Sequence, residues 1–429
     1  MKTPTKVWAR VPHDRSGRAA YPHAAAPWPK VRMGEIADFI QTGPFGSQLH
    51  QHDYSENGTP VVMPKDLICG CISETTIARV SEEHVGRLSR HKVKPGDFLF
   101  SRRGDVGRCA LVREKESGWL CGTGCLRVGI KHELADSQFL LYSFSQHDIV
   151  AWLEGHAVGA TMPNINPAIL SNLPFPLPPL PIQRRIASVL GAYDDLIENN
   201  RRRIALLEKM ARELYRERFV RRAGKGNTVT LGEIMSITRG LSYTSKEIDT
   251  EDGVNLINLK NIRSFGGFRE EGTKKYSGDY KNAQVVKKGD LVMGVTDMTQ
   301  ERRTVGAVAL LPDLEGESVL SADLIKIDSD FGNCFLFCMF CYGGVSSQIG
   351  QFATGATVLH LRPQAVLDFS VTLPPREEVE EFESQIFPLF EEQGNLLSQN
   401  RSLSRQRDKL LPRLMSGKIN VEDLAKEEK

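Results

Sequence analysis

The chain has 429 residues, of which 40% are hydrophobic and 25% are charged, and its formal net charge is +2. This length exceeds what one hydrophobic core supports and predicts two domains with connecting segments. No uninterrupted apolar run approaches the roughly 20 residues that a membrane span needs, so we expect no membrane association. Residues 1–28 lack the apolar stretch of a signal peptide, and we expect them to form a disordered leader.

Two segments predict mixed domains of short strands and helices. Residues 29–175 alternate β-rich runs with glycine, proline and asparagine turn signals, and residues 137–154 have a helical apolar face. Residues 226–373 follow the same pattern, and we expect strands near 254–259, 291–295 and 305–311 and a helix near 333–350. Each segment ends in a proline-rich stop, and a long helix follows it. The sequence therefore predicts an α+β fold class.

The two long helices, expected at about 182–222 and 376–415, have apolar residues at alternating spacings of three and four. This spacing predicts a coiled-coil seam. The seam residues of the first helix are Leu190, Tyr193, Ile197, Asn200, Ile204 and Leu207; those of the second are Ile386, Leu389, Leu396, Asn400, Leu403 and Leu410. A single polar residue in a seam fixes its register, and Asn200 and Asn400 occupy the same place. We expect the helices to pair antiparallel; alternatively, each lies on its own domain.

Four short motifs recur in the same order, with offsets between 193 and 198 residues. The matching pairs are Gly34-Glu35-Ile36 with Gly232-Glu233-Ile234, Lys94-Pro95-Gly96-Asp97 with Lys287-Lys288-Gly289-Asp290, Gly159-Ala160-Thr161 with Gly355-Ala356-Thr357, and Leu177-Pro178-Pro179 with Leu373-Pro374-Pro375. Solenoid repeats are much shorter, at about 20 to 50 residues. The chain is therefore a duplicated domain-plus-helix, and we expect pseudo-twofold symmetry suited to a target with two parts.

Eight cysteines occur without any secretory feature, so we expect free thiols and a cytoplasmic protein. Cys334, Cys338 and Cys341 share one face of a predicted helix, but their neighbours are apolar. No paired Cys-x-x-Cys or nearby histidine completes a zinc site. These residues are interpreted as buried thiols and not as metal ligands.

The basic charge is concentrated on the first long helix. Residues 181–225 contain twelve Lys and Arg against six Asp and Glu, whereas residues 376–429 contain nine against twelve. This distribution fits a polyanion near the first helix, or a solvated helix face. No local catalytic signature accompanies it: Ser416-Gly417-Lys418 lacks the upstream glycine of a phosphate-binding loop, and each Pro-Pro follows a leucine. The sequence favours a binding protein over an enzyme.

Several stretches resemble the specificity (S) subunit of type I restriction-modification systems. The resemblance covers the chain from about residue 30. The stretches that carry it are Leu177–Ala187 with the helix after it, Gly43–Ser47 with Asp53-Tyr54, Gly155–Asn166, and Leu410–Ile419. Ile182-Gln183 and Glu377-Glu378 depart from the Glu-Gln that the family usually has after the proline run.

The resemblance implies that each repeat is a target-recognition domain that reads one half of a split double-stranded DNA sequence. The paired helices would set the gap between the halves and dock two modification (methyltransferase) subunits, and restriction (translocase and nuclease) subunits would join them. The resemblance also implies that this chain is non-catalytic and binds no cofactor or metal; S-adenosylmethionine, and ATP with Mg, would belong to the partner subunits.

With this resemblance, the expected domains follow the repeat. They are a leader at 1–28, target-recognition domain 1 at 29–180, a central spacer helix at 181–222, target-recognition domain 2 at 223–375, a distal spacer helix at 376–415 and a C-terminal tail at 416–429.

Residues that contact DNA are predicted in glycine-punctuated loops, because Arg, Lys, Asn and Gln read base edges and bind phosphates. For the first domain they are Gln48, Lys65, Arg102, Arg103 and Arg108; for the second they are Lys260, Asn261, Arg263, Arg302 and Arg303. For each residue the alternative is a solvated surface group.

Three alternatives to this function are compatible with the sequence. The chain could belong to a system that only methylates or that cleaves through a different partner. It could be a nuclease or methyltransferase with a cryptic site, or a scaffold that binds no DNA.

Overall fold

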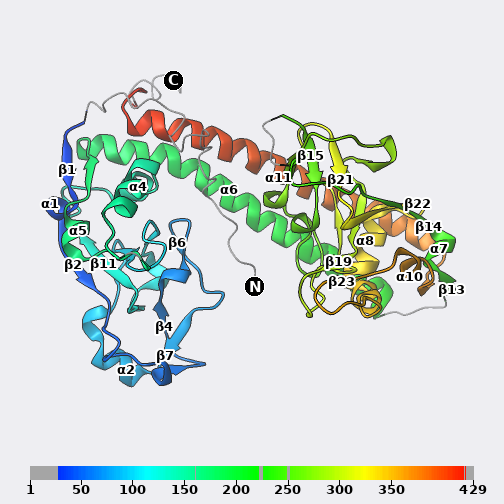
Figure 1. The fold of residues 1–429 in the computed structure, drawn as a ribbon, viewed down its shortest axis with the longest axis horizontal. Coiled ribbons are helices and arrows are strands. Elements are labelled where there is room, and N and C mark those ends of the chain that lie inside the picture. The colour runs from blue at the N-terminus through cyan, green and yellow to red at the C-terminus, as the bar shows by residue number, and fades with distance from the viewer. Residues whose placement is uncertain (1–27, 160, 222–225, 249–251, 420, 422–429) are drawn as a thin grey trace. The chain divides into compact units, whose positions relative to one another are not determined.

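The computed structural model describes residues 28–159, 161–221, 226–248, 252–419 and 421. Most of the expected leader and of the C-terminal tail therefore lies outside the described residues. The contacts divide the chain into a first unit, Met1–Asp195 with Leu403–Lys429, and a second unit, Leu196–Ser402. Both units mix strands and helices (Figure 1). This agrees with the expected mixed α/β class.

The first unit contains two four-stranded sheets, ordered β2-β11-β8-β9 and β10-β4-β7-β3. Its strands are β1 Lys30–Arg32, β2 Ala37–Thr42, β3 Tyr54–Ser55, β4 Thr59–Val62, β5 Leu67–Ile68, β6 Cys71–Ile72, β7 Ala78–Val80, β8 Phe98–Ser101, β9 Cys109–Leu111, β10 Leu120–Cys121, β11 Cys125–Ile130 and β12 Pro174–Pro176. Its short helices are α1 Met33–Ile36, α2 Glu82–Arg87, α3 Ser137–Phe144, α4 His147–His156 and α5 Pro167–Ser171. All neighbours are antiparallel except β10 and β4, which are parallel.

The second unit has the corresponding sheets β14-β22-β18-β20 and β16-β15-β21-β17, and β15 and β21 are its parallel pair. Its strands are β13 Asn227–Thr230, β14 Met235–Arg239, β15 Val254–Ile257, β16 Lys274–Tyr276, β17 Val285–Val286, β18 Leu291–Gly294, β19 Thr296–Asp297, β20 Val308–Leu310, β21 Ser318–Leu320, β22 Leu324–Ser329, β23 Leu359–His360 and β24 Ser370–Leu373. Its short helices are α7 Leu231–Ile234, α8 Asn333–Tyr342, α9 Val345–Gly350 and α10 Pro363–Leu367. The order β2-β11-β8-β9 thus recurs in full as β14-β22-β18-β20. In the other sheet β10-β4-β7 recurs as β21-β15-β16, but the fourth strand differs: β3 pairs with β7, whereas β17 pairs with β21.

A central strand in each unit separates two apolar clusters. In β8, Phe98 and Phe100 point into the cluster that also includes helix α3, whereas Leu99 points into the cluster between the two sheets. In β18, Leu291 likewise points into the cluster that includes helix α8, and Val292 points into the other cluster. Successive side chains of a strand point to opposite faces, so a continuous apolar run marks a strand that is buried on both sides.

The repeated Gly-Glu-Ile motif caps a short helix in each unit. The Glu35 carboxylate accepts a hydrogen bond from the backbone N–H of Arg32 at 2.9 Å, and Glu233 accepts one from Thr230 at 2.6 Å. These bonds satisfy N–H groups that the first turn of α1 and of α7 leaves unpaired.

The repeated Gly-Asp motif closes the turn before the central strand. Asp97 accepts a hydrogen bond from the backbone N–H of Lys94 at 2.7 Å, and Asp290 accepts one from Lys287 at 3.0 Å. The glycines before these aspartates have φ of +89° and +85°, a conformation that favours glycine.

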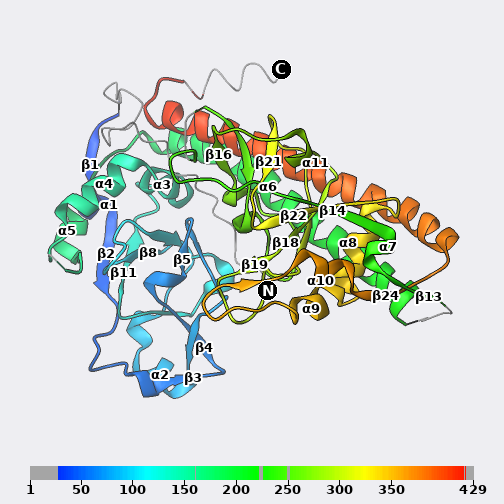
Figure 2. The same ribbon diagram turned by 45° about the vertical axis from the view of Figure 1, so that its right-hand side comes forward.

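Two long helices follow the domains: α6 Leu180–Tyr215, which continues as a π-helical turn over Arg216–Val220, and α11 Arg376–Met415. Figures 1 and 2 both show them side by side. Within the second unit, Asn200 donates a hydrogen bond to Asn400 at 3.0 Å. All twelve predicted seam residues are buried or half-buried.

The structure corrects three local expectations. The helix expected at 137–154 is two helices, α3 and α4, and the helix near 333–350 is also two, α8 and α9. Gly344, with φ of +79°, interrupts the second of these. The prolines at 174–176, interpreted as a stop, form the edge strand β12 paired with β1. Proline is tolerated there because an edge strand needs no inward N–H.

All eight cysteines are free. Cys334 and Cys338 lie in the apolar core of the second unit, as expected, and Cys341 is half-buried at its edge; burial raises the pKa of the Cys341 thiol to about 12. Among the residues that the structure describes, no group of His, Cys, Asp or Glu side chains is arranged to hold a metal ion. No helix in the described part of the chain is long and apolar enough to span a membrane.

Candidate nucleic-acid interface

Three loops meet in the first unit around the turn between β10 and β11. The backbone N–H of Gly43 donates to the carbonyl of Cys125 at 2.9 Å, and that of Arg102 donates to Gly124 at 2.8 Å. The carbonyl of Arg102 in turn accepts from the N–H of Ile165 at 3.0 Å. The loops that follow β2 and β8 and the loop that precedes α5 therefore form one continuous surface.

The second unit joins its corresponding loops in the same way. The backbone N–H of Gly240 donates to Leu324 at 3.2 Å, and Val295 donates to Asp323 at 2.9 Å and accepts from Leu361 at 2.8 Å. The duplication therefore extends from the sheets to this set of loops, which we call the loop surface of each unit.

The repeated Gly-Ala-Thr motif lies in the third loop of each surface; Ala160 itself is outside the described residues. Gly159 and Gly355 have φ of +110° and +147°. A Cβ on Gly159 would lie 2.7 Å from the carbonyl oxygen of Met162, and a Cβ on Gly355 would lie 1.9 Å from that of Val358. Glycine is needed at both positions because a side chain would collide with the returning backbone.

Arg102 and Arg103 are adjacent arginines on the first loop surface. Within the described residues neither side chain makes an ion pair, and the buried Nε of Arg102 has no hydrogen-bond partner. Burial, together with the neighbouring charge of Arg103, lowers the pKa of Arg102. A guanidinium without a carboxylate partner is suited to bind a phosphate or the edge of a guanine, and it performs no acid–base chemistry at neutral pH.

Arg302 lies in the corresponding loop of the second unit, between β18 and β20, although Val295 makes the backbone bonds that correspond to those of Arg102. Its Nε is also buried without a hydrogen-bond partner in the described structure, and its φ is +50°. The loop is shaped by Asp297, which is 2% exposed and accepts hydrogen bonds from the backbone N–H groups of Thr299 at 2.7 Å and Thr304 at 2.6 Å. Burial alone would raise the pKa of Asp297, but these bonds outweigh it and hold the pKa at about 2.

Most of the other predicted contacts lie on the surface but already have partners. Arg108 pairs with Asp105 at 2.6 Å, and Arg303 pairs with Glu301. The side chain of Lys65 donates to the carbonyl of Thr76 at 2.9 Å, and that of Gln48 accepts from the backbone N–H of Phe45 at 3.1 Å. Lys260 is exposed. None of these contacts prevents DNA binding, so these residues stay predictions.

The structure contradicts the choice of Asn261. Its side chain is fully buried, and its amide donates to the carbonyl of Arg269 at 2.9 Å and to the hydroxyl of Thr273 at 2.8 Å. Asn261 therefore holds a turn together and cannot reach DNA. Arg263 is also engaged, because it pairs with Glu208 of α6 at 2.7 Å.

Sequence reasoning missed the residues that shape the loops. Asp297 bonds mainly to residues close to it in the sequence, but no familiar motif marks it. Gly159 and Gly355 carried a signal, because they belong to a repeated motif.

Comparisons with known proteins agree on one family. Residues 26–209 match the family model of the type I restriction modification DNA specificity domain. The MjaIX type I specificity subunit of Methanocaldococcus jannaschii is 26% identical over 404 residues, which are 87% of this chain and 89% of the relative. The MjaVIII specificity subunit of the same organism is 23% identical over 326 residues, 68% of this chain and 73% of the relative.

The fold has a counterpart among solved structures. The crystal structure of the type I restriction-modification S subunit from M. genitalium superposes with a TM-score of 0.58 at 17% identity, covering 91% of this chain and 96% of that one. The family model and these relatives agree: the chain is similar over most of its length to the specificity subunits of type I restriction-modification systems.

Proposed function

We propose that each unit reads one half of a split, asymmetric double-stranded DNA target, so that this chain supplies the sequence specificity of a type I restriction-modification complex. DNA sequence recognition is the role of the family, and the chain is a recognition subunit and not an enzyme. S-adenosylmethionine and ATP chemistry would belong to the partner subunits.

The observation that carries this proposal is the duplicated loop surface. Each copy presents an arginine whose buried Nε has no partner in the described structure, Arg102 in the first unit and Arg302 in the second. The two arginines lie in corresponding loops, between β8 and β9 and between β18 and β20, and the side chains around them differ. Corresponding loops with different side chains suit two half-sites that differ in sequence.

The helices α6 and α11 would act as the spacer between the half-sites and would dock two modification subunits, with which restriction subunits assemble. The contacts Asn200 with Asn400 at 3.0 Å and Arg203 with Glu392 at 2.6 Å support antiparallel pairing, because residue numbers rise along α6 as they fall along α11. Antiparallel helices in a duplicated chain support pseudo-twofold symmetry. On this proposal the target-recognition domains are residues 29–180 and 223–375.

The test is to co-express the full chain with its neighbouring methyltransferase in a host without adenine methylation and to map methylated bases across the genome. The expected result is one split motif with one methylated adenine in each half. A continuous motif, or no methylation by a stable complex that also binds no DNA, would refute the proposal and favour the scaffold alternative.

A further inference from the structure

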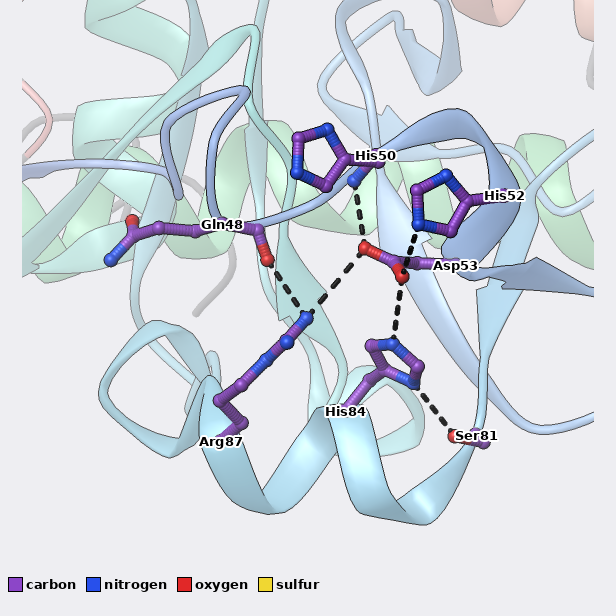
Figure 3. Close-up of polar contacts among 7 residues, drawn as sticks. All are labelled: Gln48, His50, His52, Asp53, Ser81, His84 and Arg87. Atoms are coloured by element: carbon purple, nitrogen blue, oxygen red, sulfur yellow. Dashed lines mark hydrogen bonds and ion pairs between the residues drawn. The ribbon is translucent and has the colours of Figure 1, made fainter.

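A carboxylate in the first unit joins the loop after β2 to helix α2 (Figure 3). One oxygen of Asp53 accepts from the backbone N–H of His50 at 2.8 Å, and the other lies 3.0 Å from Nε2 of His84. A carboxylate only accepts hydrogen bonds, so Nε2 of His84 donates to it. Nδ1 of His84 lies 2.8 Å from the hydroxyl of Ser81, which completes the chain of hydrogen bonds.

Arg87 of α2 completes the cluster: its guanidinium points toward Gln48 and Asp53, and much of its side chain is exposed (Figure 3). Its Nη2 donates to the backbone carbonyl of Gln48 at 3.0 Å and lies 3.6 Å from the Asp53 carboxylate. The Arg87 side chain is 58% exposed, whereas that of Asp53 is 9% exposed. Within the described residues Nε and Nη1 of Arg87 make no hydrogen bond, so these donors are available for a ligand.

The same loop is fixed on its apolar side. Leu49 is 4% exposed and packs in one cluster with Val85 and Leu88, which lie in and directly after α2. The loop is therefore held to the helix by an apolar anchor and by the Asp53 network. A guanidinium attached to a loop held at two points is fixed before a ligand arrives, which lowers the entropic cost of binding.

The loop also belongs to the first loop surface. It begins at Gly43, whose backbone N–H donates to the carbonyl of Cys125. The carbonyl of the preceding residue, Gly124, accepts from the backbone N–H of Arg102. His52 adds a polar ring, 80% exposed and 3.5 Å from Asp53, that stacks on His50 at a centroid distance of 5.2 Å. The cluster thus offers donors on a loop whose first residue joins the first loop surface.

We propose that Arg87 contacts a DNA backbone phosphate next to the half-site read by the first unit, and that Asp53 is the positioning residue that fixes Arg87 and the loop for this contact. The inference rests on the proposed function and adds to it a phosphate-binding site. Arginine matches phosphate because its N–H groups form a planar fork. Phosphate contacts position a protein on the duplex and carry no sequence information directly.

The part of the second unit that the structure describes shows no corresponding cluster. Glu247 stands at the corresponding turn and accepts from the backbone N–H and the hydroxyl of Thr244, at 2.6 and 2.7 Å. Within the described residues Glu247 makes no ion pair. On this proposal the cluster gives the first unit a backbone contact without a counterpart in the described part of the second unit.

The experiment uses the full chain purified with its co-expressed methyltransferase. It measures the Kd for a DNA duplex that contains the motif found by methylation mapping, over a series of salt concentrations. Arg87→Ala should weaken binding about tenfold near 0.1 M salt, since a charge-assisted bond is lost. The slope of log K against log salt should fall by about 0.9, which corresponds to one phosphate. The methylated motif should not change. Arg113→Ala, which removes an exposed arginine next to Glu114 and Glu116 in the same unit, is the matched control and should leave both quantities unchanged.

Asp53→Asn separates positioning from plain charge. Removing a negative charge next to DNA would tighten binding if only the net charge mattered. If Asp53 positions Arg87, the same substitution should weaken binding several-fold despite the gain in positive charge. Arg87→Lys keeps the charge but loses the fork, and should keep the salt slope while losing part of the affinity.

Unchanged affinity of Arg87→Ala, equal loss in Arg113→Ala, or tighter binding by Asp53→Asn would each overturn the inference. A changed motif would also overturn it, because Arg87 would then be a base reader. Assembly with the methyltransferase and the melting temperature serve as folding controls. If the complex without substitutions shows no sequence-specific DNA binding, the proposed function fails. If that complex binds DNA and the Arg87 variants bind with the same affinity, only this inference fails.

Discussion

Arg103 is exposed and Arg102 is half-buried, and neither has an ion-pair partner in the described structure. Replacing both with alanine should weaken DNA binding by the assembled complex by tenfold or more, because charge-assisted hydrogen bonds to phosphate or bases are lost. Assembly with the methyltransferase should be unaffected. The measurement is a DNA titration by fluorescence anisotropy alongside size-exclusion chromatography of the complex. Unchanged affinity would remove both residues from the interface.

Asp297 makes the stability of the second loop surface depend on pH. The pKa of its carboxylate is about 2 in the folded chain against 3.8 ordinarily. A group whose pKa is lowered by folding stabilises the protein above its ordinary pKa, and this contribution is lost as the pH falls through the folded value. Asp297→Asn should therefore be less stable than the unmodified chain at about pH 6, and the difference should shrink between about pH 4 and pH 2.

Urea denaturation at about pH 6 and pH 3 checks this prediction. Asp313→Asn, at an exposed position of the same unit, is the control and should show a small difference at both values. A difference for Asp297→Asn that is the same at both pH values would contradict the role given to its charge.

At the scale of residues, residue type and loop context predicted Arg102 and Arg302 as DNA contacts but could not distinguish the buried Asn261 from them. Asn261 is buried because its amide bonds to residues 8 and 12 positions later, in a turn that no motif announces. Arg263 was chosen without knowledge of Glu208, which lies 55 residues earlier on α6. The Asp53 cluster was missed for the same reason, since His84 is 31 residues away from Asp53. Partners distant in sequence decide whether a polar side chain is free.

At the scale of elements, a fully buried arginine connects α3, α6 and α11 in the first unit. The Arg407 side chain is 0% exposed and pairs with Asp194 of α6 at 2.6 Å, and Asp194 also accepts from the Tyr142 hydroxyl of α3 at 2.6 Å. Arg407→Ala would leave Asp194 without this cation and should lower the free energy of unfolding by about 3 kcal/mol. Thermal unfolding of the complex measures the effect.

The matched control is Arg202→Ala on the exposed face of α6. Arg202 pairs with Glu198 one turn earlier, at 75% and 51% exposure, and exposed pairs contribute about 0–1 kcal/mol. Equal destabilisation by the two substitutions would show that burial of Arg407 has no special effect.

Helices whose apolar residues recur with a regular period could be predicted from the sequence, but interruptions within such helices could not. The second long helix was expected at 376–415 and spans Arg376–Met415, because its apolar seam persists over many turns. The helix expected at 333–350 breaks at Gly343-Gly344, although its apolar residues continue on both sides. Periodicity reports which side chains are buried, and it does not report whether the backbone between them turns.

At the scale of the whole chain, the duplication was the most informative sequence feature. The repeated motifs mark a cap, a turn and a loop, which are the places where backbone geometry tolerates few residue types. The side chains that we predict to read bases lie between these motifs and have no such constraint, so the repeat does not reveal them. The framework is therefore readable from the sequence, and the DNA target is not.

If α6 and α11 set the spacing between half-sites, lengthening both should lengthen the gap. One heptad of native sequence would be inserted directly after Asn200 and another directly before Asn400, so that the hydrogen bond between these residues is retained. Seven helical residues add about 10 Å, which corresponds to about three base pairs of B-DNA. Genome-wide mapping of methylated adenines should show both half-sites unchanged and a gap longer by about three base pairs.

Insertion into α6 alone is the control: it shifts the apolar seam of α6 against that of α11 and should reduce the stability of the complex. A stable double-insertion complex that methylates the original motif would mean that the helices hold the units together without setting their spacing on DNA.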